Sequence, residues 1–412
     1  MTDPPPRADL VVAGASELLT CVPRAGDPLG RIAGGSVAVT GEVIVAVGSA
    51  AEIAARVDTS AARVVDATGR IVAPGFVDSH THLVFGGSRA HEYSAIVTDS
   101  LDALKARGVP TGILATVGMT RAESVEELTA SASLRLEAML RHGTTTVESK
   151  TGYGLSALDE AKMLEVNRRL QELQPVDVVS TFLGAHDLPS DLPRDRWVDL
   201  LVEELIPKTA EDGLAAFCDV YCDDGYYTVE ESRRILVAGL TAGLQPKIHA
   251  DAYSGIGASA LAAEVGAVSA DHLNHTDRAT MRRLAETGVV GVVMPALDFA
   301  VQHPRPFDAR AMLEEGMTLA LATDLCPACW VESLQLVMAL ACRLYRLSPA
   351  EALVAATAGG AQALGLDDRG TLEPGKLADL QIWNVPSFED VVYRIGSNAV
   401  QAVMKRGVLL PP

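Results

Sequence analysis

The sequence predicts an α/β protein: a (β/α)8 TIM-like barrel with a small β-sandwich domain built from both termini. Three observations lead to this prediction. Short apolar strands alternate with helical segments through the middle of the chain, strand-type patterns occupy both ends, and 412 residues suit a barrel with an appended domain. We place the two parts of the β domain at residues 1–72 and 366–412, and the barrel at residues 73–365.

The first 72 residues carry strand patterns. Residues 36–47 alternate between valine and other residues on both sides of Gly41, which is typical of a hairpin with a tight glycine turn. Residues 10–12 and 63–72 supply further strand material.

The last 47 residues return to the same pattern. An apolar run at 377–383 follows a turn sequence, and residues 399–404 and 408–410 predict a hairpin around Gly407. Two or three strands cannot bury a face alone, so we expect the two ends to form one domain.

The middle of the chain alternates strands and helices. The strands fall at 144–148, 176–183, 246–249, 267–271, 289–294 and 318–322, and the helices at 157–173, 229–242, 259–264, 278–286 and 309–315. Apolar strands in this order favour a parallel sheet covered by helices. A last helix starts at Ser348, where Pro349 and Glu351 complete a capping box. A doubly wound open sheet is the competing fold, but no Gly-x-Gly-x-x-Gly follows the first strand.

Composition and charge limit the kinds of molecule that this protein is expected to bind. Hydrophobic residues make up 48% of the chain and aromatic residues only 4%, which indicates a folded enzyme with an aliphatic core. The formal net charge of −19 repels phosphate backbones and anionic headgroups, so we expect no nucleic acid and no membrane partner. An anionic substrate would need a cationic side chain inside its pocket.

The sequence also indicates a cytoplasmic protein. Its start contains three consecutive prolines and no basic stretch followed by an apolar run, so it does not resemble a secretory signal. No apolar segment reaches the ~20 residues that cross a bilayer. Six cysteines in a chain of this length do not form a disulfide framework, which suits a reducing compartment.

Metal-ligand residue types stand at the predicted strand ends. His80 and His82 follow the first barrel strand and, one residue apart on extended backbone, point to the same side. His249, His272 and Asp324 each close a later strand. A single histidine at a strand end is more often a buried, hydrogen-bonded side chain, but carboxyl ends of barrel strands converge on one mouth. The coincidence of all five residues predicts a metal centre.

Several segments carry a family resemblance. Residues 74–82 (PGFVDSHTH) resemble the signature of the amidohydrolase superfamily. Five further segments narrow the resemblance to the imidazolonepropionase family of histidine catabolism: 83–89, 147–155, 182–186, 217–220 and 269–273. The similarity extends over nearly the whole chain, including both terminal β segments.

The resemblance implies a ligand set. Position by position, His80, His82, His249 and Asp324 would bind one divalent metal, Zn²⁺ or Fe²⁺/Fe³⁺. Three neutral imidazoles and a carboxylate suit either metal and leave a position for water. Lys150 raises the alternative of a carboxylated lysine between two metals, which we consider the weaker reading because its segment matches the one-metal family.

The resemblance also implies a substrate and its contacts. Arg89, Tyr153 and His186 would contact the substrate, a small anionic cyclic amide, and His272 would lie beside the attacking water. An arginine offers a bidentate partner for the carboxylate of such a substrate. The implied assembly is a homodimer.

The expected reaction is the hydrolytic opening of 4-imidazolone-5-propanoate to N-formimidoyl-L-glutamate. Asp324 would accept the proton of the water and pass it to the departing ring nitrogen, and His272 would stabilise the oxyanion.

Two departures from the family pattern leave alternatives open. Ala252 stands where the family has a glutamate three residues after the strand-five histidine, and Cys326 to Cys329 (CPAC) replaces Asn-Pro-Gly-Ser. The two thiols could be packed side chains, a redox or zinc pair, or a further ligand. The chain could therefore open a related cyclic amide or amidine, or be a catalytically inactive barrel that acts as a binding protein.

Overall fold

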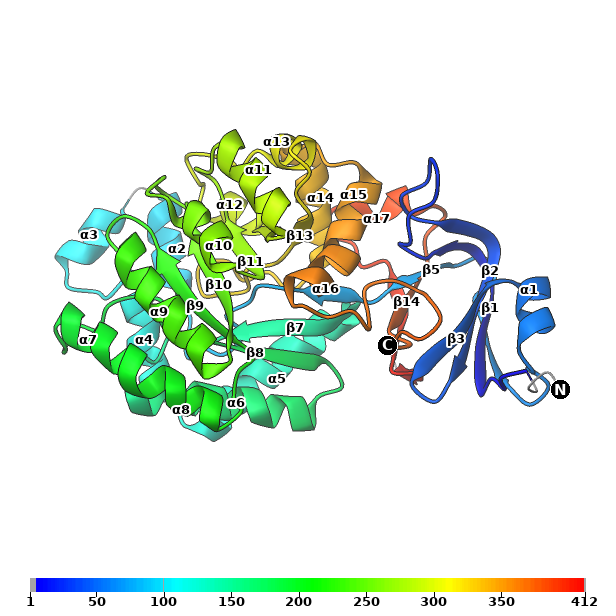
Figure 1. Ribbon diagram of the computed structural model, residues 1–412, viewed down its shortest axis with the longest axis horizontal. Coiled ribbons are helices and arrows are strands. Elements are labelled where there is room, and N and C mark those ends of the chain that lie inside the picture. The colour runs from blue at the N-terminus through cyan, green and yellow to red at the C-terminus, as the bar shows by residue number, and fades with distance from the viewer. Residues whose placement is uncertain (1–4, 99, 411–412) are drawn as a thin grey trace.

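The computed structural model describes residues 5–98 and 100–410 and contains two eight-stranded sheets. Figure 1 shows a barrel of strands surrounded by helices at one end of the molecule and a second sheet at the other. The predicted fold class, a barrel with a β domain contributed by both termini, is confirmed. Among the described residues no helix is both long and apolar enough to span a membrane.

The barrel strands run in sequence order and pair in parallel throughout. They are β6 (Phe76–Asp78), β7 (Thr144–Lys150), β8 (Asp177–Ala185), β9 (Phe217–Cys222), β10 (Gln245–Ala250), β11 (Ser269–His272), β12 (Val290–Val293) and β13 (Leu319–Leu321). The ring closes just beyond the first and last strands, where Thr81 and Leu325 form a parallel bridge. The Asp324 amide donates to the His80 carbonyl over 3.1 Å at the same seam.

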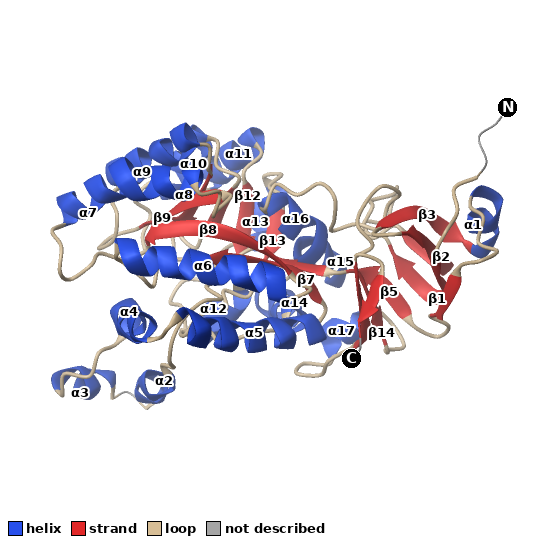
Figure 2. Cartoon of the chain, turned by 90° about the horizontal axis from the view of Figure 1, so that it is seen from below, coloured by secondary structure: helices blue, strands red, loops and turns tan. Residues whose placement is uncertain are grey.

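Helices cover the outside of the barrel (Figure 2). They are α5 (Val125–Arg141), α6 (Ala157–Leu173), α7 (Arg194–Leu200) with η1 (Leu201–Leu205) and α8 (Ile206–Glu211), α9 (Val229–Ala242), α10 (Ala258–Val265), α11 (Arg278–Thr287), α12 (Pro295–Ala300), α13 (Ala309–Glu314), α14 (Leu334–Leu344), and α15 (Pro349–Val354) with η2 (Ala355–Gly359) and α16 (Gly360–Ala363). The capping box predicted at Ser348 is present at α15.

An arm of three helices interrupts the alternation between β6 and α5. It consists of α2 (Ala90–Val97), α3 (Leu101–Ala106) and α4 (Gly112–Ala122), and Figure 2 shows α2 and α3 projecting from the barrel. Sequence analysis did not predict these helices. Helix α2 exposes Tyr93 and Val97, so its pattern lacks the single buried face by which an amphipathic helix is recognised.

The second sheet has the order β16-β15-β14-β5-β1-β2-β3, with β4 beside β1. Its strands are β1 (Leu10–Leu19), β2 (Arg31–Thr40), β3 (Val43–Ser49), β4 (Arg63–Asp66), β5 (Ile71–Pro74), β14 (Leu380–Trp383), β15 (Val400–Lys405) and β16 (Val408–Leu410). Strands β5 and β14 pair antiparallel, with Val72 opposite Ile382, and so join the two ends of the chain. Two short helices lie between these strands in the sequence: α1 (Ala50–Arg56) between β3 and β4, and α17 (Glu389–Tyr393) between β14 and β15.

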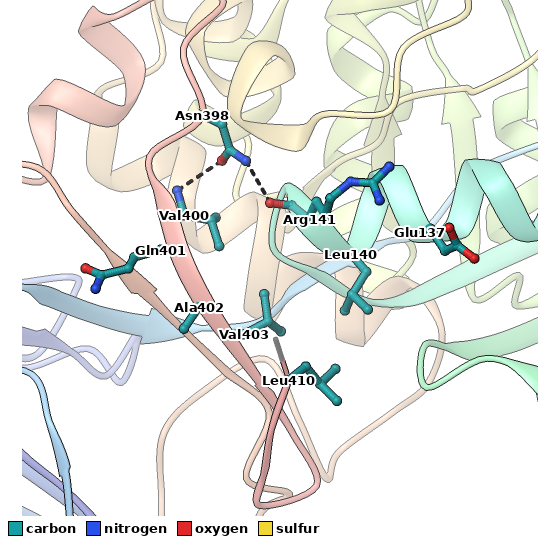
Figure 3. A pocket seen from close by; sticks show the side chains of 9 residues that line it. All are labelled: Glu137, Leu140, Arg141, Asn398, Val400, Gln401, Ala402, Val403 and Leu410. Atoms are coloured by element: carbon teal, nitrogen blue, oxygen red, sulfur yellow. Dashed lines mark hydrogen bonds between the residues drawn. The ribbon is translucent and has the colours of Figure 1, made fainter. Parts of the chain in front are cut away.

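The sheet meets the barrel at the amino ends of the barrel strands. A cavity of about 300 Å³ lies at this junction. Figure 3 shows the side chains that line it, from the end of α5 and from β15. Asn398 spans it by donating to the carbonyl of Arg141 over 2.8 Å and accepting from the amide of Val400 over 3.0 Å. Because α5 ends where β7 begins, the carboxyl ends of the strands open at the opposite face of the barrel.

A buried ion cluster ties the two sheets together. Lys405 of β15 donates to Asp177, the first residue of β8, over 2.9 Å and to Asp379 over 2.5 Å. Arg369 and Arg406 also contact Asp177. The side chain of Lys405 is only 3% exposed, so its charge is compensated by these carboxylates rather than by water.

We predict that Lys405→Ala lowers the free energy of unfolding by about 3 kcal/mol, because removing one partner of a buried ion pair leaves charge uncompensated. Thermal unfolding followed by circular dichroism should show a Tm several degrees below that of the unchanged protein. Lys208→Ala is the matched control, since Lys208 pairs with Glu211 and Asp212 on the exposed surface. Equal Tm values for the two variants would contradict the prediction.

Candidate metal centre

The five predicted strand-end residues lie at one mouth of the barrel. His80 and His82 follow β6, His249 lies in β10, His272 ends β11 and Asp324 follows β13. All five side chains are buried. His272 and Asp324 have left-handed backbone, with φ of 80° and 47°, a conformation that costs non-glycine residues energy and is found at functional sites.

Their potential ligand atoms converge. Single ring nitrogens of His80, His82 and His249 lie within 4.8 Å of one another, and the same holds for His80, His272 and Asp324. Asp324 Oδ1 is 3.7 Å from His80 Nε2 and 3.7 Å from His82 Nε2. Such a group can close around a single small cation.

Several of these atoms lack hydrogen-bond partners in the described part of the chain. They are His80 Nε2, His82 Nδ1, both ring nitrogens of His249, and Asp324 Oδ1. Buried polar atoms are almost always paired, since leaving one unpaired costs free energy. Their concentration at one point fits a bound metal, which would take one ring nitrogen of each histidine and the carboxylate of Asp324.

Protonation also favours metal binding. Burial, and secondarily the charge of Lys150 or of neighbouring histidines, holds the pKa values of His80, His82 and His249 well below the usual value. Neutral imidazoles keep the lone pair that a metal requires. Burial raises the pKa of Asp324 to about 7.

A layer of buried charges, formed by Lys150, Lys247, Glu148, Asp219 and Asp271, contacts the histidines. Lys150 Nζ lies 2.7 Å from Asp219, 3.0 Å from Glu148 and 3.3 Å from Asp271. Lys247 Nζ lies 3.0 Å from Glu148. All five side chains are fully buried, so each charge depends on the others for stabilisation.

This charged layer orients two of the imidazoles. Asp271 Oδ2 lies 2.6 Å from His80 Nδ1, and the carboxylate can only accept, so Nδ1 carries the proton and Nε2 presents its lone pair. Asp219 Oδ2 lies 3.1 Å from His249 Nδ1, although off the hydrogen-bonding direction. A carboxylate behind a ligating imidazole is typical of metal sites.

The same layer argues against a carboxylated Lys150. Burial alone would lower the pKa of Lys150, but the charges of Asp219, Glu148 and Asp271 outweigh it and raise that pKa. The amine is therefore held as a cation among carboxylates. A carbamate there would place a further negative charge beside Asp219 and Asp271.

His186 and Tyr153 join the cluster. The ring of His186 stacks on His82 with centroids 4.6 Å apart, and the ring of Tyr153 lies 5.4 Å from His82 and 5.2 Å from His186. The ring of His272 lies 5.1 Å from His249. Burial lowers the pKa values of His186 and His272 to about 4, so both rings are neutral at pH 7.

Arg89 does not belong to the cluster of rings but pairs with an acidic side chain of α2. It stands at the start of α2, where Nε and Nη2 bond the carboxylate of Glu92 over 2.9 and 2.5 Å. Its charge acts on Tyr153 and Cys326, which places it on their side of the mouth. Nη1 makes no hydrogen bond within the described residues and is the nitrogen free for a substrate.

The structure also places the two departures from the family pattern. Ala252 is buried and offers only a methyl group. The neighbouring Asp251 points away from the histidines, since it accepts hydrogen bonds from Ser259, from Thr276 over 2.9 Å and from the Ala258 amide over 3.2 Å. It therefore does not replace the acid that position 252 lacks.

Cys326 and Cys329 face each other across a tight turn. Each backbone amide donates to the carbonyl of the other, over 3.1 and 3.0 Å. Both thiols are buried and free, and burial raises their pKa values. These properties describe packed thiols.

Sequence analysis missed the charged layer and one aromatic residue, Tyr221, whose ring lies 5.6 Å from His249. A signal for the layer existed: Glu148, Asp219 and Lys247 are charged residues within otherwise apolar strands. Tyr221 gave none, because an aromatic residue in such a strand is usually core. The individual roles assigned to the site residues stay predictions.

A barrel of parallel strands with imidazoles and a carboxylate converging at its mouth defines a metal-dependent hydrolase. The sequence profile of the amidohydrolase family matches residues 63–107 and 103–410. The imidazolonepropionase of Geobacillus thermodenitrificans is 44% identical, over 97% of this chain and 97% of its own length. That of Halobacterium salinarum is 43% identical, also over 97% of each. The chain belongs to the amidohydrolase family and, within it, to the imidazolonepropionases.

Solved structures share the fold. An adenosine deaminase of Xanthomonas campestris with bound zinc aligns over 98% of this chain and 93% of its own, with a TM-score of 0.72 and 22% identity. An atrazine chlorohydrolase of Arthrobacter aurescens complexed with zinc aligns over 98% and 95%, with a TM-score of 0.69 and 19% identity. At such identities the likeness is one of fold alone.

We predict that neither Cys326 nor Cys329 reacts readily in the folded protein, because thiolates are the reactive form and both thiols are buried with raised pKa values. Cys342, which is partly exposed, should be alkylated first. Iodoacetamide labelling at pH 8, with peptide mass spectrometry before and after unfolding, measures this order. Early labelling of Cys326 would show an activated thiolate instead.

Proposed function

We propose that this protein hydrolyses 4-imidazolone-5-propanoate to N-formimidoyl-L-glutamate, the reaction named by its closely similar relatives. The observation that carries the proposal is the convergence of unpaired ligand atoms from His80, His82, His249 and Asp324 at the barrel mouth. Water adds to the ring carbonyl carbon, the bond from that carbon to the ring nitrogen breaks, and a carboxylate and a formimidoyl nitrogen result.

We further propose that these four residues hold one divalent metal, zinc or iron. A bound divalent ion polarises a carbonyl and lowers the pKa of water toward ~7. The chain contributes neutral imidazoles, kept so by burial, and fixes the tautomer of His80 through Asp271. Two solved structures of the same fold contain zinc.

Asp324 is the proton carrier in this scheme. A carboxylate held at the reacting centre can act first as a base and then as an acid. It accepts a proton from the attacking water and returns it to the departing ring nitrogen. Its position beside His80 and His82 keeps it at the reacting centre throughout.

His272 stabilises the negative charge that develops on the carbonyl oxygen. Burial lowers its pKa to about 4, so it acts as a neutral imidazole that donates one N–H. The left-handed backbone of His272 turns the ring toward His80 and His249, with centroids 5.4 and 5.1 Å away.

The substrate would be held by Arg89, Tyr153 and His186. Arg89 Nη1 would donate to the substrate carboxylate, while Glu92 holds the rest of the guanidinium in place. Tyr153 and His186 present ring faces and hydrogen-bonding edges beside His82. The net charge of the chain is −19, so its overall field repels anions, and Arg89 is the local cation that would attract the anionic substrate.

A second candidate keeps the fold and metal but changes the substrate to a related cyclic amide or amidine. Buried Ala252 and the two buried thiols favour it, since they offer weaker hydrogen bonding than a carboxylate, amide or hydroxyl would. Turnover of imidazolone propionate compared with hydantoin-type rings separates the two candidates. Failure of the metal-loaded protein on every such ring would favour a binding protein.

We predict that Asp324→Asn lowers kcat on imidazolone propionate by at least 10²- to 10⁴-fold, roughly the contribution of a positioned acid–base group. The amide can neither accept the proton nor carry the ligand charge. A coupled assay on freshly prepared substrate measures the rate, with metal content determined in parallel. Asp367→Asn, the same change at an exposed position, should leave kcat unaltered. An active Asp324→Asn protein would refute the assignment.

A further inference from the structure

Tyr221 enters the barrel mouth beside the candidate metal centre. Strands β9 and β10 pair in parallel with Tyr221 opposite His249, and residues at one level of neighbouring parallel strands point to the same side. The ring of Tyr221 lies 5.6 Å from His249, 6.1 Å from His186 and 6.4 Å from His272. It is nearly parallel to His272, at 25°.

The ring of Tyr221 packs against the ring of a second tyrosine, Tyr226. Tyr226 stacks on it with centroids 4.0 Å apart and an interplanar angle of 27°. Tyr226 is itself only partly buried. The hydroxyl of Tyr221 is therefore carried by a ring with little freedom to move, as a catalytic donor requires.

The hydroxyl of Tyr221 has no hydrogen-bond partner in the described chain, although the residue is only 7% exposed. Two other buried tyrosines do have one: Tyr227 donates to the Asp187 carbonyl over 2.9 Å, and Tyr345 donates to Asp298 over 2.7 Å. Buried tyrosines usually find such partners. A protonated hydroxyl kept free at this mouth is suited to a bound ligand.

The neighbouring loop carries no competing donor at Ala252. The amide of Tyr253 donates to Asp223 Oδ2 over 2.8 Å, which holds the loop after β10 against the loop after β9. Ala252 precedes that contact and contributes a buried methyl group. Tyr221 thus supplies a polar group in the strand next to the position that lacks one.

We propose that Tyr221 is a further catalytic residue, whose hydroxyl donates a hydrogen bond to the reacting carbonyl oxygen of the cyclic amide. This inference rests on the proposed function. The hydroxyl acts together with the His272 N–H, and its hydrogen bond strengthens as negative charge builds on the oxygen. Tyr221 transfers no proton and stays a phenol throughout.

The test compares Tyr221→Phe with Tyr393→Phe, the same change at an exposed tyrosine of α17. Each removes one hydroxyl and keeps a ring, so the packing of residue 221 against His249 is preserved. Tyr221→Phe should lower kcat about 10²-fold, the usual effect of losing one oxyanion donor, with KM, metal content and Tm unchanged. Tyr393→Phe should match the unchanged protein. Imidazole-4-propanoate, which lacks the reacting carbonyl, should bind the unchanged protein and Tyr221→Phe equally.

The other outcomes would contradict either the role of Tyr221 or the proposed function. If the unchanged protein opens the ring and Tyr221→Phe retains its kcat, the role of Tyr221 falls while the proposed function stands. The role also falls if Tyr221→Phe loses metal, or if its loss is confined to KM with weaker binding of imidazole-4-propanoate. If the unchanged, metal-loaded protein opens no cyclic amide, the proposed function falls and this inference with it.

Discussion

The buried layer of Lys150, Lys247, Glu148, Asp219 and Asp271 is the constraint on which the rest of the site depends. Three carboxylates and two ammonium groups of this layer lie directly behind the imidazoles. The carboxylates favour a cation among the histidines, while burial lowers the pKa values of His80, His82 and His249 and keeps these rings neutral. Removing any member would leave an uncompensated charge in the barrel centre, so the layer fixes both stability and ligand orientation.

One face of the barrel contributes contacts that stabilise the fold, and the opposite face carries the candidate metal centre. At the amino ends of the strands, Lys405 and Asp177 bind the terminal sheet to the barrel. At the carboxyl ends, His272 and Asp324 adopt left-handed backbone, which an unconstrained chain would avoid. A firmly anchored barrel can hold such residues in place, and these are the positions from which side chains reach the candidate metal centre.

Much of this arrangement could be predicted from the sequence. Helices α6 and α9 were predicted to the residue because Ser156 and Thr228 cap them and their apolar faces are regular. The proposed ligands stood out because histidine and aspartate are unusual at the ends of apolar strands. The partners Asp219 and Asp271 of Lys150 could not be predicted, since they come from two other strands and meet Lys150 only through folding. Tyr221 was missed because its proposed role depends on a hydroxyl without a hydrogen-bond partner, and no sequence pattern predicts hydrogen bonding of a side chain.

The central claim is that His80, His82, His249 and Asp324 share one metal ion. X-ray absorption spectroscopy of the zinc- or iron-loaded protein tests it most directly. The account predicts a first shell of nitrogen and oxygen alone, at about 2.0–2.2 Å for zinc, with the outer-shell scattering of several imidazoles. A sulfur neighbour near ~2.3 Å, scattering from a second metal, or a protein that retains no metal would contradict it.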